Sequence, residues 1–345
     1  MISKRQQEIL EFIRMNPMLS SSEINNNIGF TISSATLKRD ISDLVALGFI
    51  SIFGKGKGSK YIISDSYKLL FPINLDEYFS KEVDEREINE SFNFEIFQHL
   101  REINIFSKDE LRSLDNLHLK FIKNISDLNE VQYQKEMERL GIDLSWKSSQ
   151  IEGNTYSLLE TERLLKEKET ASGKTKDEAV MLLNHKSALD FILENKDYLS
   201  PMSLSKIEDV HSLLVKELNV DRNIRNKRVG ITGTNYKPLD NEFQIKEVMI
   251  SMCELVNSKE NVFERALIIL LLISYIQPFF DGNKRTARIV SNAELISKGY
   301  CPLSFRSVDS IDYKKAMLVF YEQNNLYPFK KIFMEQYEFA VNTYF

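Results

Sequence analysis

The sequence predicts a mainly α-helical protein that begins with a small module of helices and one β-hairpin. Glycines mark this module, because five of the 12 lie within residues 1–58 and the next is Gly141. From about Ser91 onward, apolar residues recur at helical intervals with few helix breakers. The length of 345 residues favours two domains, and a content of 43% apolar and 28% charged residues excludes wholesale disorder.

Charge divides the chain at the same place. Residues 1–66 hold eight Lys and Arg against six Asp and Glu, and their net charge of +2 leaves −7 for the rest of a chain whose total is −5. An acid-rich stretch that follows indicates a solvated connection. We therefore expect a basic module over residues 1–66, an acidic connection over 67–90 and a helical domain over 91–345.

The first module is predicted as three helices followed by a hairpin. An amphipathic helix is expected over residues 4–15, and a second short helix follows the capping serines at 20–22. A third helix is expected from about Ser33 to Gly48. Two short apolar strands, at residues 49–53 and 61–63, flank a turn of alternating glycines and lysines.

This order of elements resembles a winged helix-turn-helix domain, in which the third helix enters the major groove and the wing touches phosphates. The resemblance implies duplex DNA as a partner. The residues it places against DNA are Ser33, Ser34, Thr36, Lys38 and Arg39 of the third helix and Lys55, Lys57 and Lys60 of the turn. Winged helices also serve as protein-interaction modules, and a net charge of +2 is a weak electrostatic signal. The turn lacks the residue order of a phosphate-binding P-loop, which excludes that motif.

Membrane, secreted and zinc-binding classes are disfavoured. The longest uncharged apolar run, Ala266–Ile276, is well short of the roughly 20 residues that cross a bilayer, so it predicts a core helix. The first residues contain no apolar signal-peptide segment, and we expect a cytoplasmic protein without a membrane partner. Cys253 and Cys301 lie far apart without metal-ligand spacing, and are expected to be buried thiols.

The most informative segment is residues 277–288, with the sequence Gln-Pro-Phe-Phe-Asp-Gly-Asn-Lys-Arg-Thr-Ala-Arg. Pro278 and Gly282 predict a loop after the core helix, with a new helix starting at Asn283. The first turn of that helix offers backbone N–H groups and a favourable dipole to an anion.

Three side chains of this segment extend the anion site. Arg285 and Arg288 lie one helical turn apart on the same face, and Asp281 is an oxygen ligand suited to a hard cation. Backbone amides, two guanidinium groups and a carboxylate can together hold a Mg²⁺-bound polyphosphate. The spacing therefore predicts nucleotide chemistry.

The segment resembles the signature of the Fic family, His-Pro-Phe-x-Asp/Glu-Gly-Asn-Gly/Lys-Arg-x-x-Arg, at every fixed position but the first. The resemblance implies an all-α Fic domain with flanking helices over about residues 91–345. It also implies transfer of AMP from ATP to a hydroxyl side chain of a target protein, with Asp281 as the Mg²⁺ ligand. The phosphate-binding residues it implies are Gly282, Asn283 and Lys284 for the α- and β-phosphates, and Arg285 and Arg288 for the β- and γ-phosphates.

The departure from the signature is at its catalytic position, where the family's histidine is Gln277. That histidine is the general base for the attacking hydroxyl, and a carboxamide has no comparable basicity near neutral pH. Loss of a positioned base typically slows a reaction by about 10²–10⁴-fold. The substitution therefore predicts impaired AMP transfer. None of the four histidines of the chain lies in the motif.

A second segment, Ser148-Ser149-Gln150-Ile151-Glu152-Gly153, resembles the inhibitory Ser/Thr-x-x-x-Glu-Gly/Asn motif of Fic proteins. The resemblance implies an inhibitory helix over about residues 145–153. There Glu152 would pair with Arg288 and occlude the γ-phosphate position in cis, with Ser148 and Gly153 as the other motif residues. Taken alone, Ser-x-x-x-Glu is a common helical spacing on solvated faces.

A third segment, residues 229–238, is rich in β-forming residues and predicts a β-hairpin, which we call the flap. In Fic proteins a flap at this place pairs with an extended target segment, which implies docking at Ile231, Thr232, Gly233 and Thr234. A hairpin that only covers the core is the alternative.

Two rival functions remain open beside the adenylyltransferase. One is a DNA-binding regulator whose Fic domain senses ATP, and the other is a protein-interaction scaffold. The Tyr- and Phe-rich segment at residues 313–345 indicates either core packing or a homodimer face.

Overall fold

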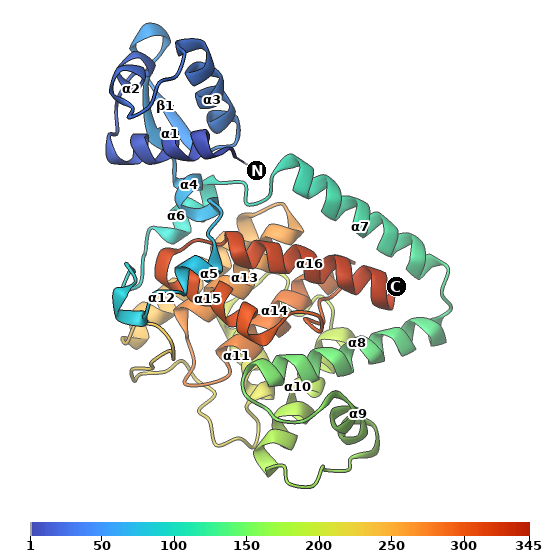
Figure 1. Cartoon of the computed structure of the whole chain (residues 1–345). Coiled ribbons are helices and arrows are strands. Elements are labelled where there is room, and N and C mark those ends of the chain that lie inside the picture. The colour runs from blue at the N-terminus through green and yellow to red at the C-terminus, as the bar shows by residue number, and fades with distance from the viewer. Residues whose placement is uncertain (1) are drawn as a thin grey trace. The chain divides into compact units, whose positions relative to one another are not determined.

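The structure is a computed structural model that describes residues 2–345, except for the side chain of Lys57. It consists of two compact units (Figure 1). Unit 1 comprises the chain up to Ile73 together with Gln323–Tyr327, and unit 2 comprises Asn74–Glu322 and Pro328–Phe345.

Unit 1 contains the predicted three helices and hairpin. Its elements are α1 (Lys4–Met15), α2 (Ser21–Asn27), α3 (Ser34–Ala46), β1 (Ile50–Phe53), β2 (Lys60–Ile63) and α4 (Asp65–Leu70). Serines at positions 3, 20 and 33 cap α1, α2 and α3, each accepting a backbone N–H through its hydroxyl. The strands pair antiparallel, with Ile50 opposite Ile63. The element predictions for the first module are thus confirmed.

The core of unit 1 is an aliphatic cluster where α1 packs against α3. The apolar positions repeat at helical spacing, so each helix buries one stripe. The fully or nearly fully buried members are Ile9, Leu10 and Ile13 of α1 and Leu37, Ile41 and Leu44 of α3.

The division into units differs from the expected boundary at residue 66. The helix α4 belongs to unit 1, together with a short segment from far along the chain. There the Asn325 side chain donates to the backbone carbonyls of Lys68 and Phe71, and the Leu326 N–H donates to that of Leu69. Contacts between segments about 250 residues apart leave no local signal in the sequence.

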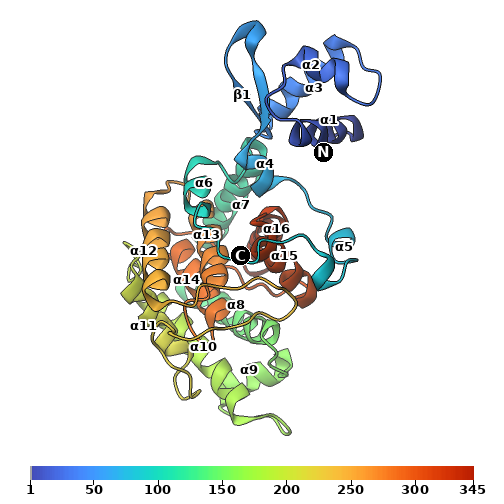
Figure 2. The same cartoon turned by 90° about the vertical axis from the view of Figure 1, so that its left-hand side faces the viewer.

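Unit 2 is built mainly of helices, which are joined by loops such as residues 215–241. Its elements are α5 (Leu75–Tyr78), α6 (Ile96–Glu102), α7 (Lys108–Ser126), α8 (Glu130–Ile151), α9 (Leu158–Glu167), α10 (Lys176–Glu194), α11 (Leu204–Leu214), α12 (Glu242–Ser258), α13 (Val262–Ile276), α14 (Asn283–Ser297), α15 (Ser310–Gln323) and α16 (Tyr327–Tyr344). The helices α13 and α14 pack on each other at the centre, with α12 on one side and α15 and α16 on the other (Figure 2).

The predicted core helix is α13, in which every residue of the run Ala266–Ile276 is buried. No helix among the described residues is long and apolar enough to cross a membrane. Cys253 and Cys301 are buried free thiols, as expected, and burial raises the pKa of Cys253 to about 12. The aromatic residues of α15 and α16 lie mostly in the core, which favours packing over a dimer face; among them are Tyr313, Phe320, Tyr321, Phe329, Phe333 and Tyr337.

The flap differs from its predicted form. Residues 229–238 contain no strand, only a turn at Thr232 and Gly233 and one isolated bridge between Lys237 and Ser91. The expected hairpin would need a ladder between its two arms, but the arm after the turn pairs instead with residues of the connecting segment. The strand prediction for this segment was wrong.

Candidate functional site

The loop between α13 and α14 is fixed by one carboxamide. Asn283, the first residue of α14, donates through Nδ2 to the carbonyl of Phe279 at 2.8 Å and accepts the Phe279 N–H through Oδ1 at 2.8 Å. It also donates to Gln277 Oε1 at 3.0 Å. Because Asn283 is 5% exposed, these bonds are shielded from water and hold the loop in one shape.

Gly282 leads into α14 in a conformation that other residues rarely adopt. Its φ is +79°, and a Cβ at this position would lie 3.2 Å from the ring of His211 and 3.3 Å from Val215. No side chain caps α14 here. The first amides of α14 therefore lack both intrahelical acceptors and a side-chain cap, which suits an anion.

The ring of His211, in α11, packs against the α13–α14 loop. It stacks on Phe279 with centroids 3.6 Å apart, and Nδ1 lies 3.2 Å from the hydroxyl of Thr286. Burial lowers the pKa of His211 to about 4, so the ring is neutral at physiological pH. The neutral ring of His211 therefore packs against the loop without adding a charge to it.

Arg288 is fully buried and surrounded by acceptors. Its Nε donates to Ser148 Oγ at 2.8 Å, and its Nη2 donates to the Ser148 carbonyl at 2.8 Å and to Glu152 Oε1 at 3.0 Å. Its Nη1 lies 3.2 Å from the hydroxyl of Tyr313, whose ring the guanidinium also faces. Every nitrogen of this guanidinium is therefore engaged within the protein.

Glu152 binds two of the cations that the resemblance assigns to phosphate. It caps the C-terminus of α8, one turn after Ser148, and its Oε2 pairs with Lys284 at 3.3 Å while Oε1 pairs with Arg288. Burial alone would raise the pKa of Glu152, but the charges of Arg288 and Lys284 outweigh it and the pKa lies below its ordinary value. Glu152 is thus an anion held by two cationic side chains.

Arg285 is buried but less fully paired than Arg288. Its Nη2 donates to Asp281 Oδ2 at 3.0 Å, and its Nε and Nη1 have no hydrogen-bond partner among the described residues. Burial lowers the pKa of Arg285, with Asp281 opposing that effect. Unpaired buried donors are costly, which indicates an acceptor that the chain itself does not supply.

Asp281 is the single carboxylate available for a metal ion at this loop. Its side chain is 61% exposed, and its Oδ1 accepts the Gly282 N–H at 2.6 Å. No group of three or more metal-binding side chains occurs among the described residues. Since Mg²⁺ is typically held by one or two carboxylates plus substrate phosphates, Asp281 fits that role only together with a polyphosphate.

Gln277 has both ends of its carboxamide engaged. It follows α13 with φ of +51°, its Nε2 donates to the Ser274 carbonyl at 2.6 Å, and its Oε1 accepts from Asn283. The group is held in place but offers no basic lone pair.

The flap is tied to this loop at its base. Arg225, which is 3% exposed, donates to the carbonyl of Gln277 at 2.6 Å and to that of Lys227 at 2.8 Å, and it also bonds the carbonyl of Leu239. The backbone N–H of Arg225 donates to the carbonyl of Pro278. One buried guanidinium therefore joins both ends of the flap to the α13–α14 loop, a role that the sequence pattern did not reveal.

A cavity of about 400 Å³ brings the three predicted segments together. Its wall includes the C-terminus of α8, the flap and the α13–α14 loop. The helix α15 also lines it, which the sequence did not predict. Glu152 lines this cavity, whereas the fully buried Arg288 lies behind it. The lining residues are Ile151, Glu152, Gly153, Gly230, Ile231, Thr232, Gln277, Lys284, Tyr313, Lys314, Met317, Leu318 and Tyr321.

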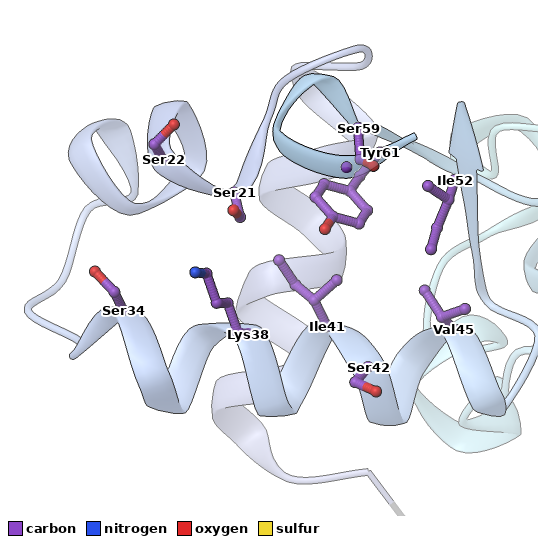
Figure 3. Close-up of a pocket in the computed structure, with 11 residues that line it drawn as sticks. Ser21, Ser22, Ser34, Lys38, Ile41, Ser42, Val45, Ile52, Ser59 and Tyr61 are labelled. Atoms are coloured by element: carbon purple, nitrogen blue, oxygen red, sulfur yellow. The ribbon is translucent and has the colours of Figure 1, made fainter. Parts of the chain in front are cut away.

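Unit 1 has a separate hollow of about 780 Å³ between α2, α3 and the hairpin (Figure 3). Its wall carries serine hydroxyls, Tyr61 and the side chain of Lys38, while Arg39 and Lys55 are exposed. Three predicted DNA contacts, Ser33, Thr36 and Lys60, are engaged within the protein. Ser33 caps α3 and bonds Thr36 Oγ1 at 2.8 Å, and Lys60 pairs with Glu23 at 2.7 Å.

Only some of the residues predicted to bind DNA lie together at the hollow of unit 1. The hydroxyl of Ser34 lines the hollow beside Lys38, and Thr36 is half-buried. The side chain of Lys57 lies outside the described residues.

Comparisons with known proteins support the resemblance to Fic proteins. Residues 201–295 match the model of the Fic/DOC family. A protein adenylyltransferase Fic from Aedes aegypti is 27% identical over 190 residues, which are 53% of this chain and 37% of that protein. The protein adenylyltransferase fic-1 from Caenorhabditis elegans is 23% identical over 239 residues, which are 65% of this chain and 47% of that protein. The matches thus span less than half the length of these relatives.

Solved structures show the same fold. Fic-1 residues 134–508 from C. elegans aligns with a TM-score of 0.59 at 21% identity, over 68% of this chain and 72% of that one. A Fic domain containing signaling protein from Bacteroides thetaiotaomicron aligns with a TM-score of 0.56 at 20% identity, over 67% of this chain and 94% of that one. The matched part of the chain therefore has a Fic fold, with a Fic/DOC family domain at residues 201–295.

Proposed function

We propose that this chain is a Fic-type protein adenylyltransferase whose nucleotide site is held closed in cis by Glu152. The observation that carries the proposal is the pairing of Glu152 with both Arg288 and Lys284 at the wall of the cavity. Adenylyltransferase relatives that align over about half of the chain support ATP as the substrate.

In the open state, the triphosphate takes the place of the Glu152 carboxylate. The first amides of α14 and Lys284 bind the α- and β-phosphates, and the unpaired N–H groups of Arg285 with the freed Arg288 bind the outer phosphates. Asp281 would hold Mg²⁺, which would supply positive charge to the triphosphate. While Glu152 stays ionised, it competes for these cations and repels the triphosphate.

In the transfer step, a hydroxyl oxygen of the target attacks the α-phosphorus, and the bond from that phosphorus to the oxygen bridging the β-phosphate breaks. Pyrophosphate leaves, and the hydroxyl proton must pass to a base. Gln277 orients groups at this point but accepts no proton, so the proton passes to solvent and the step is slow. Ile231 and Thr232 of the flap line the same cavity, where residues 231–234 can pair with an extended target segment.

The test is the double variant Glu152→Gly/Gln277→His with α-labelled ATP, compared with each single variant. Phosphate alignment and proton removal are needed in one transition state, so each single change should gain little and the pair should give strong labelling of protein. A silent double variant would overturn the adenylyltransferase proposal and favour an ATP-sensing regulator.

A second function, binding of duplex DNA by unit 1, is favoured by the exposed face of α3. Lys38 and Arg39 are exposed there, and serine hydroxyls surround Lys38 in the hollow (Figure 3). Such groups contact phosphates and base edges. Electrophoretic mobility shift with a pool of random duplexes at low salt tests this, and no shift at any protein concentration would assign unit 1 to protein contacts.

A further inference from the structure

The predicted acidic connection at residues 67–90, the connecting segment, contains a buried arginine where a solvated stretch was expected. Among the described residues 74–90, Arg86 is the only one that is buried, with 2% of its side chain exposed. Its acidic neighbours in the sequence are exposed. Removing a guanidinium from water is unfavourable unless specific partners compensate, so the contacts of Arg86 are informative.

Two of those contacts fix Arg86 within unit 2. Its Nη1 lies 3.3 Å from Oε2 of Glu322, a fully buried carboxylate near the end of α15. Tyr78 donates its hydroxyl to the same oxygen at 2.6 Å. The guanidinium also faces the ring of Phe79, with 5.0 Å to the centroid. We call Tyr78, Arg86 and Glu322 the clamp.

Arg86 also contacts the flap. Its Nη2 donates to the backbone carbonyl of Gly233 at 2.7 Å. Gly233 is the turn residue of the flap, has φ of +89° and is exposed. The clamp therefore reaches from the core of unit 2 to the tip of the flap.

Other bonds between the connecting segment and the flap lie beyond the turn. Asn235 donates to Asp84 Oδ1 at 2.8 Å, and the Lys237 N–H donates to the Glu90 carbonyl at 2.8 Å. Since the flap has no ladder of its own, its shape depends on such outside contacts. Arg225 holds the base and Arg86 holds the tip.

We propose that Arg86 is a positioning residue that sets the flap for docking of the target segment. The proposal rests on the proposed function, in which residues 231–234 receive that segment. A flap tip released from Arg86 samples many conformations, and a docking target must then order it at an entropic cost. The phosphate-binding groups do not contact Arg86, so nucleotide affinity should not depend on it.

The first test measures hydrogen exchange of the flap in the full chain without nucleotide or target. Replacing Arg86 alone would leave the buried Glu322 carboxylate without its counter-charge, so the test variant is Arg86→Met/Glu322→Gln, which removes both charges together. Amides at residues 231–236 should exchange about tenfold faster, as expected for loss of a charge-assisted hydrogen bond, while α13 and α14 stay protected. Arg86→Lys should fall in between, and Lys81→Ala, an exposed lysine of the same segment, should match wild type.

The second test measures transfer in the Glu152→Gly/Gln277→His background. Adding the clamp variant should lower protein labelling from α-labelled ATP by about tenfold, with Mg·ATP affinity by calorimetry unchanged within about threefold. Unchanged flap exchange would overturn the positioning role whatever the activity. Faster flap exchange in a chain that labels nothing in either background would leave the positioning of the flap intact and remove the proposed function instead. A parallel loss of ATP affinity and of protection in α13 and α14 would mean that Arg86 only stabilises the fold, which also overturns the proposal.

Discussion

Replacing Glu152 by glutamine should strengthen binding of Mg·ATP. The variant keeps the shape of the side chain and removes its charge, so that Arg288, at 3.0 Å, and Lys284, at 3.3 Å, lose a competing anion. A hydrogen bond to a charged group contributes about 1.5–3 kcal/mol, and the pair with Lys284, which is partly exposed, contributes less. At about 1.4 kcal/mol per factor of ten, the expected gain in affinity is about 10- to 100-fold.

Isothermal titration calorimetry with Mg·ATP measures this gain. The fold should survive the change, because Arg288 keeps its bonds to Ser148 and Tyr313, and a thermal melt checks this. Glu162→Gln is the matched control, since Glu162 pairs with Lys166 at 2.8 Å on α9, away from the nucleotide cavity. Equal affinity in wild type and Glu152→Gln would refute the reasoning that Glu152 and the triphosphate compete for the same cations.

Three further results are expected. Arg285→Ala should weaken Mg·ATP binding about tenfold by calorimetry, because the unpaired N–H groups of Arg285 are assigned to phosphate, and an unchanged affinity would place the nucleotide elsewhere. Because the pKa of His211 is lowered to about 4 in the folded chain, the unfolded chain binds the proton first as pH falls below about 6.5, and stability is lost. His211→Gln should reduce this loss of unfolding free energy between pH 6.5 and 5 by up to about 1.4 kcal/mol per pH unit. Identical pH slopes in denaturant melts of wild type and variant would contradict this. If unit 1 binds duplex DNA, neutralising Lys55, Lys57 and Lys60 together should flatten the salt dependence of binding, with Lys60 contributing least because it already pairs with Glu23, and an unchanged slope would exclude the hairpin turn from the interface.

The local elements could be predicted from the sequence because their signals are local. Capping serines and a stripe of Ile and Leu define α1, and Pro278 with Gly282 marks the loop before α14, which begins at the predicted Asn283. The contact of Glu152 with Arg288 was implied by the resemblance of two separate segments to Fic motifs, and each segment could be recognised from its own residues.

What the sequence could not supply depends on contacts between distant segments. Tyr313 bonds Arg288 from 25 residues away, and Lys284 shares Glu152 with it, although neither contact has a periodic signature. Arg86 sits in an acidic run whose composition indicates solvent, and only the fold shows that it reaches Gly233. The flap was wrongly predicted as a hairpin because its two arms form no ladder with each other, and its isolated bridge joins Lys237 to Ser91.

The position of the bound triphosphate is the most direct test of inhibition by Glu152. A crystal structure of the Glu152→Gly variant with Mg²⁺ and a non-hydrolysable ATP analogue would locate each phosphate. We expect the α- and β-phosphates at the first amides of α14, the metal ion at Asp281, and the γ-phosphate at Arg288 in the place that the Glu152 carboxylate occupies in the present structure. Density for the nucleotide away from residues 281–288, or a phosphate chain that leaves Arg288 bonded only to Ser148 and Tyr313, would contradict this expectation.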